Sequence, residues 1–239
     1  MQMSESRKIE ISVAKITKTL GITTAVVLAA GFVANYYIYH VAKHADTKMA
    51  SLMQRFDLGF EPSIPNFYSA LLLLSCAICL CIISSSKFAH AIKWKKYWVL
   101  LTLIFFFLSL DEAVMIHEMA DAVLQRKLNT TGVLYLAWVI PFGIFAAAVG
   151  LIYLRFLMDL ERKTAIRFVV AGAIFVGGAI GMEMAAAPII ETVGPSSIYH
   201  TFTQTIEEGM EMTGAILFLR ALLLYIAQIH DDILVKTSP

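Results

Sequence analysis

Six apolar runs divide this chain, and each is long enough to cross a lipid bilayer. They cover roughly residues 20–40, 66–86, 97–118, 132–156, 168–190 and 199–229. An α-helix needs about 20 apolar residues to cross a hydrocarbon core of about 30 Å. Only helices and closed barrels satisfy their backbone hydrogen bonds in lipid, and these runs lack the alternating pattern of barrel strands. The sequence therefore predicts an all-α integral membrane protein, with one transmembrane helical domain over residues 1–239 that forms a six-helix bundle.

Charge and composition agree with a membrane location and predict an orientation. Hydrophobic residues make up 59% of the chain and charged residues 15%, which excludes soluble and disordered classes. With both termini in the cytoplasm, thirteen Lys and Arg residues fall in inner segments and five in outer ones. This bias satisfies the positive-inside rule and predicts a bacterial inner (plasma) membrane protein. The basic residues are spread over several loops, so membrane lipids are the predicted partners and nucleic acid is not.

Acidic residues gather at the opposite end of the apolar runs. Twelve of the eighteen Asp and Glu residues, and four of the six histidines, fall at the predicted outer end. An ionisable group at membrane depth is costly unless it has a partner, water or a metal. This end, facing the periplasm or the exterior, is therefore the predicted location of a functional site.

Helix geometry predicts that several of these residues lie at one height. At a rise of 1.5 Å per residue, Asp111 lies about 22 Å above Lys96, and Glu183 about 24 Å above Arg167. By the same rule His117 and Glu118 lie about 32 Å above Lys96, and all of these residues fall in the outer leaflet or at its boundary. On the sixth helix, residues spaced by three or four share one stripe. Opposed stripes of carboxylate and imidazole groups supply oxygen and nitrogen ligands for a divalent transition metal, namely zinc, iron or manganese.

The predicted metal ligands are therefore carboxylates and imidazoles from three helices. They are Asp111, His117, Glu118, Glu183, His200, Glu207 and Glu211. Glu112 and Glu208 lie beside them and are the predicted catalytic groups that handle protons. The segment His117-Glu118-Met119-Ala120-Asp121 resembles the H-E-x-x-H motif of zinc proteases, with Asp121 in place of the second histidine.

Three functions are compatible with this pattern. The first is a metal-dependent enzyme that acts on a lipid-soluble or interfacial substrate. The second is a proton- or cation-coupled transporter that uses the same acids. The third is an accessory subunit or helix-mediated oligomer within a larger membrane complex. For this third function, a stripe of small residues (Ala173, Gly177, Gly181 and Ala185) is the predicted helix-packing face.

Overall fold

The computed structural model describes residues 9–42, 48–60, 63–87, 89–229 and 233–236. Within those residues, six helices are long and apolar enough to cross a membrane. They are Val13–Val41, Ile64–Ser85, Lys95–Val114, Val139–Asp159, Arg162–Val193 and Ile198–Ile229. Each overlaps one predicted run, so the helical architecture with six helices of membrane length is confirmed.

Two of the six helices contain a π-helical segment. The first consists of α1 (Val13–Tyr36) and the π-helical turn η1 (Tyr37–Val41). The fifth consists of α8 (Arg162–Val176), the π-helical segment η4 (Gly177–Met182) and α9 (Glu183–Val193). The remaining four are α3 (Ile64–Ser85), α5 (Lys95–Val114), α7 (Val139–Asp159) and α10 (Ile198–Ile229).

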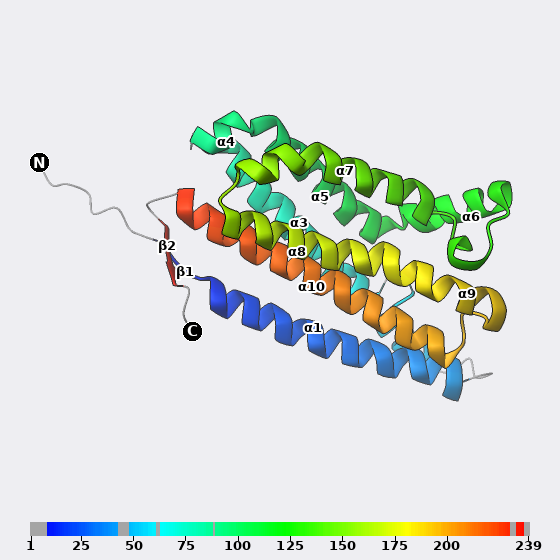
Figure 1. Ribbon diagram of the computed structural model, residues 1–239. Helices are drawn as coiled ribbons and strands as arrows, with labels where there is room; N and C mark the ends of the chain where they lie inside the picture. The colour runs from blue at the N-terminus through cyan, green and yellow to red at the C-terminus, as the bar shows by residue number, and fades with distance from the viewer. Residues whose placement is uncertain (1–8, 43–47, 61–62, 88, 230–232, 237–239) are drawn as a thin grey trace, which may run out of the picture.

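Short elements connect these helices. They are α2 (Lys48–Met53), η2 (Gln54–Phe56), α4 (Ala89–Lys93), α6 (Ile116–Leu128) and η3 (Gly132–Leu134). Two short strands, β1 (Ile9–Ser12) and β2 (Ile233–Lys236), pair in parallel with Ile9 opposite Ile233. The first and last described segments therefore lie together at one end of the bundle, which we call the strand end (Figure 1).

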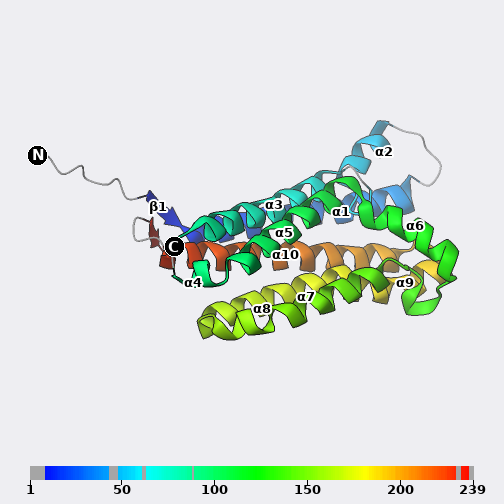
Figure 2. The same ribbon diagram turned by 90° about the horizontal axis from the view of Figure 1, so that it is seen from above.

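Helix α10 lies at the centre of the bundle (Figures 1 and 2). It packs against α1, α3 and α8, and also against η4 and α9, whereas α5 packs mainly on α3 and α7 on α8. Its side chains Met212, Ala215 and Leu222 are buried. Because α10 contacts most of the other long helices, its position determines which of their faces meet.

Aromatic side chains fill the half of the bundle near the strand end. The Trp98 ring is fully buried, with its centroid 4.8 Å from that of Phe156 and 5.1 Å from that of Tyr225. Phe168 completes the cluster at 6.1 Å from Trp98. These four rings come from α5, α7, α10 and α8, so they join four helices through edge and stacked contacts. This half of the bundle is a packed apolar core.

Two glycines allow α10 to approach the fifth helix closely. A Cβ atom on Gly214 would lie 2.7 Å from the backbone nitrogen of Phe175, and 2.8 Å from its Cα. A Cβ atom on Gly178 would lie 3.0 Å from the backbone oxygen of Glu207 and from Cγ of Glu211. Any larger residue at Gly214 would push the two backbones apart, as at close helix crossings in membranes.

The small-residue stripe predicted from the sequence is not this packing face. Ala173, Gly181 and Ala185 are exposed, and a Cβ atom on Gly181 would meet nothing within 4 Å. Gly177 alone touches α10, where a Cβ atom would lie 3.2 Å from Cε of Met210. Phe168 and Ala171 of α8 are buried while Ala173 is exposed, so the inward face of the fifth helix is already set before η4 and continues through Phe175 and Gly178.

We expect Gly214→Ala to destabilise the protein, because the added methyl group would meet the backbone of Phe175 rather than a flexible side chain. Overpacking of this kind costs about 1–3 kcal/mol. The matched control is Gly172→Ala on α8, where an added Cβ atom would meet nothing within 4 Å. Thermal unfolding midpoints in detergent should fall for Gly214→Ala alone. Equal midpoints for both variants would show that the close approach is not required.

Candidate functional site

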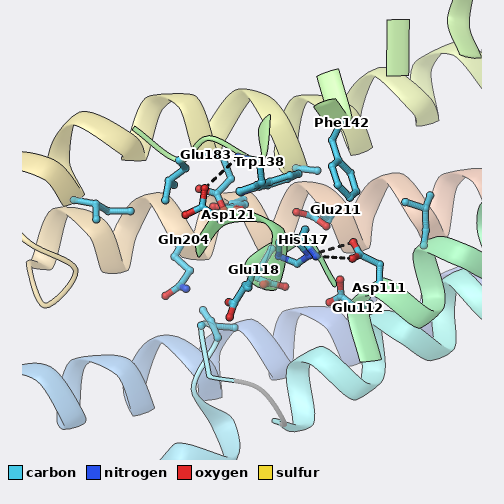
Figure 3. A pocket seen from close by; sticks show the side chains of 18 of the residues that line it. Asp111, Glu112, His117, Glu118, Asp121, Trp138, Phe142, Glu183, Gln204 and Glu211 are labelled. Carbon is cyan, nitrogen blue, oxygen red and sulfur yellow. Dashed lines mark hydrogen bonds and ion pairs between the residues drawn. The ribbon is translucent and has the colours of Figure 1, made fainter. Parts of the chain in front are cut away.

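An acidic cavity of about 460 Å³ (Figure 3) lies near α6 and α9, at the end of the bundle opposite the strand end (Figure 1). Carboxylate and imidazole side chains from α5, α6, α9 and α10 line it. They are Asp111, Glu112, His117, Glu118, Asp121, Glu183, His200, Glu207, Glu208 and Glu211. The structure thus brings all nine predicted site residues to one cavity. Among the described residues that line it, none is a lysine or an arginine.

A break between α5 and α6 turns His117 and Glu118 toward the cavity. Helix α5 ends at Val114, and Met115 adopts a left-handed conformation with φ of 58° before α6 begins at Ile116. The prediction of one continuous helix over residues 97–118 is therefore wrong, and so is the height calculated for His117 and Glu118. Left-handed backbone is unfavourable for a residue with a side chain, and such strain concentrates at functional sites.

Asp111 holds this break together. Its Oδ1 accepts a hydrogen bond of 2.9 Å from the backbone N–H of His117 in the first turn of α6. Its Oδ2 lies 3.1 Å from Nδ1 of the same imidazole (Figure 3). Asp111 is only 7% exposed. Because each oxygen contacts His117, Asp111 acts here as a positioning residue that fixes the orientation of the ring, and its role as a metal ligand stays a prediction.

Glu112 is anchored from the neighbouring helix α3. The side-chain amide of Asn66 donates to Oε1 of Glu112 at 3.3 Å and also to its backbone oxygen. Asn66 is buried and lies in the first turn of α3, whose N-cap is Ser63. Asn66 was not among the site residues predicted from the sequence. The only signal was a polar residue at the outer end of an apolar run, which many surface residues share.

Trp138 joins three of the groups that line the cavity. Its backbone N–H donates to Oδ1 of Asp121 at 3.1 Å, and its ring centroid lies 4.9 Å from that of His117. Its side chain also hydrogen-bonds Glu183. Asp121 and Trp138 were not among the predicted site residues. The α5–α6 break brings Asp121 inward, and that break was not visible in the sequence.

Carboxylates from different helices face one another across the cavity. Glu207 interacts electrostatically with Glu183 of α9 and with Glu112 of α5. Glu211, one turn further along α10, interacts with Glu112, Glu208 and Glu183. Like charges this close in a low dielectric cannot all remain ionised without compensation. The cavity therefore requires protons, a metal ion or another cation.

The segment after η2 covers part of the cavity. Oδ1 of Asn35 in α1 accepts a hydrogen bond of 3.0 Å from the backbone N–H of Leu58. Its Nδ2 donates a hydrogen bond of 2.9 Å to Oε1 of Gln204. Leu58 and Gly59 both line the cavity. Asp57 stabilises this turn, because its Oδ1 accepts a hydrogen bond of 2.9 Å from the backbone N–H of Gly59. Burial raises the pKa of the Asp57 carboxyl, and that hydrogen bond partly opposes the increase.

The side chains are not already arranged around a metal. Within the described residues, no group of three or more His, Cys, Asp or Glu side chains stands in a metal-holding arrangement. Binding an ion would therefore draw carboxylates inward from the cavity walls. Glutamate side chains can make this movement by rotation about their side-chain bonds.

The family of the chain follows from a comparison with family models. Residues 19–226 match the model described as "Domain of unknown function (DUF8692)", and the chain belongs to this family. No curated protein and no solved structure matches it. The match covers all six long helices in whole or in large part, including every residue named above as lining the acidic cavity.

We expect Met115→Gly to retain the helix break with unchanged or higher stability, because glycine adopts a φ of 58° without steric cost. Met115→Val should lower stability by about 1 kcal/mol or more, because a β-branched residue is strongly disfavoured in this conformation. Val114→Gly is the matched control, since glycine is less favourable than valine at a right-handed helical position by about 0.5 kcal/mol. Unfolding midpoints that fall equally for both glycine variants would contradict a requirement for the left-handed residue.

Proposed function

We propose that this chain is a six-span membrane protein with both termini in the cytoplasm. Its long helices carry large apolar side chains that would face water in a soluble protein. Met158 is 76% exposed, Leu151 70%, Ile144 67% and Phe67 64%. Extensive exposed apolar surface is typical of a surface that contacts lipid or another protein. The excess of Lys and Arg in the strand-end segments supports a cytoplasmic strand end and a periplasmic or exterior acidic cavity.

We further propose that the acidic cavity binds a divalent transition metal, namely zinc, iron or manganese. The observation that carries this proposal is the convergence of carboxylates and imidazoles from four helices on one cavity whose lining contains no lysine or arginine. Oxygen and nitrogen donors of this kind suit these metals. The pairing of Asp111 with Nδ1 of His117 is also typical of metal sites, where a carboxylate orients the imidazole so that the other nitrogen binds the ion.

The proposed ligands are His117 together with carboxylates that line the cavity from α6, α9 and α10. They are Glu118, Glu183, Glu207 and Glu211, with His200 and Asp111 as further members of the site. A bound ion of this kind would supply an activated water or oxygen species to a lipid-soluble or interfacial substrate. Glu112 and Glu208 are the proposed proton-handling groups, because they line the same cavity as the proposed ligands.

A transporter that uses the same acids is the alternative function. Such a protein needs a polar path through the bundle. The strand-end half instead contains the aromatic cluster around Trp98, which packs four helices together. This packing favours a site that is open from one end. A role as an accessory subunit would use the exposed small residues Ala173, Gly181 and Ala185 to contact a second membrane protein.

We expect Glu211→Gln to lower the metal content of the purified protein without unfolding it. Glutamine keeps the shape of the side chain but removes the negative charge that a divalent ion needs. We expect affinity to fall about tenfold or more, as for other disrupted metal sites. The control is Glu161→Gln, an exposed position at the strand end, which should leave metal content unchanged. Elemental analysis after purification without chelator, and again after reloading, measures the effect. Wild-type protein that retains no zinc, iron or manganese would refute the proposal.

The proposed orientation is tested by labelling single cysteines in sealed cells. In a Cys81→Ser background, cysteines at the exposed positions Asn129 and Ser196 should react with an impermeant thiol reagent. A cysteine at exposed Glu161 should react only after the cells are opened. Labelling of Glu161→Cys in intact cells would reverse the orientation. Cys76 and Cys79 are buried and should give no background signal.

A further inference from the structure

We propose that the acidic cavity binds an amphipathic organic amine, with the protonated amine among the carboxylates and the apolar part on the cavity floor. The amine is the substrate class that we infer for the acidic cavity. Its role as a substrate rests on the proposed enzymatic function. The binding itself rests on three observations: the size of the cavity, the division of its walls, and the sign of its charge.

The cavity is larger than a metal ion requires. Its volume of about 460 Å³ falls within the range of about 300–1,000 Å³ that is usual for small-molecule sites. A water molecule takes up about 30 Å³ in the liquid, so a hydrated ion fills only part of this space. The remaining volume accommodates an organic molecule beside the ion.

The walls of the cavity are divided into a polar belt and an apolar floor. The belt consists of the carboxylates Asp111, Glu112, Glu118, Asp121, Glu183, Glu207, Glu208 and Glu211. Leu108 precedes Glu112 by one turn on α5, so it lies about 6 Å nearer the strand end. Phe175 precedes Glu183 on the fifth helix, and Leu73 lies more than two turns inside α3. All three of these apolar side chains line the cavity below the carboxylates. A ligand that satisfies both regions therefore has a polar head and an apolar body.

The charge of the belt selects the head group. Eight carboxylates line the cavity, and no lysine or arginine among the described residues opposes them. This arrangement repels a carboxylate or phosphate head and attracts an ammonium group. A metal ion of the proposed kind uses about four protein donors, so carboxylates remain to bind an ammonium group. The rings of Trp138 and Phe142 also line the cavity and offer aromatic faces to a cation.

His200 provides an independent indication of a missing hydrogen-bond partner. Its Nδ1 is buried and has no hydrogen-bond partner among the described residues. His200 lines the cavity beside Gln204, one turn further along α10. A buried nitrogen of this kind is costly without a partner. In the tautomer that carries the proton on Nε2, Nδ1 accepts a hydrogen bond, which an ammonium N–H can donate.

The test compares three ligands that share an aromatic body and differ in their head groups. Phenethylamine, phenethyl alcohol and phenylacetate are titrated into chelator-treated protein in phosphatidylcholine nanodiscs, and heats of binding are measured against empty nanodiscs. We expect phenethylamine to bind at least about tenfold more tightly than the alcohol, a difference typical of one charge-assisted hydrogen bond, and phenylacetate not to bind. Methylamine, which lacks the apolar body, should bind more weakly than phenethylamine.

Variants of the belt test the location. Glu207→Gln combined with Glu211→Gln should abolish the preference for the amine over the alcohol, whereas Glu161→Gln should preserve it. Equal binding of phenethylamine and phenylacetate, or no binding of phenethylamine, would overturn the inference. The same preparations are analysed for metal uptake. Metal uptake without amine binding would overturn only this inference, whereas amine binding without metal uptake would support it and refute the proposed metal site.

Discussion

Close packing of α10 against the fifth helix is the contact on which the acidic cavity depends. Gly214 admits the backbone at Phe175, and Gly178 admits the backbone of Glu207. Without this approach, the carboxylates of α10 would not lie opposite Glu183. In lipid, helices associate largely through van der Waals contacts of this kind. The hydrophobic effect that joins helices in water is absent there, because lipid tails are as apolar as the side chains. Glycine residues therefore lie where α10 comes closest to the fifth helix.

That packing has an electrostatic consequence. Glu207 and Glu211 face Glu183 and Glu112, and their mutual repulsion opposes the same contact that brings them together. A protein that needed only stability would have apolar side chains at these positions. The helix break at Met115 adds a second local cost in the same region. Two unfavourable features at one cavity, on an otherwise well-packed bundle, are typical of a site selected for binding or chemistry.

The two halves of the bundle are specialised in opposite ways. Near the strand end, Trp98, Phe156 and Tyr225 form a rigid aromatic core. At the other end, the interior is polar and hollow, and the turn that contains Leu58 covers part of it. A rigid scaffold on one side of a polar cavity holds the functional groups in place while leaving them reachable from one surface. This arrangement suits an enzyme or a binding protein better than a conduit.

The sequence by itself determined the helical architecture, the six helices of membrane length and the gathering of ionisable residues at one end. These are local properties, since hydrophobic length and residue position are read along the chain. Only the tertiary structure decided that His117 turns back to Asp111, because this depends on a left-handed Met115 that no apolar pattern reveals. It also decided that Gly178 meets α10 while three of the four residues of the predicted stripe are exposed, because packing against α10 sets which face of the fifth helix turns inward. The predictions assumed a regular helix of 3.6 residues per turn, whereas the cavity end of this protein departs from that geometry in three places, at Met115, η1 and η4.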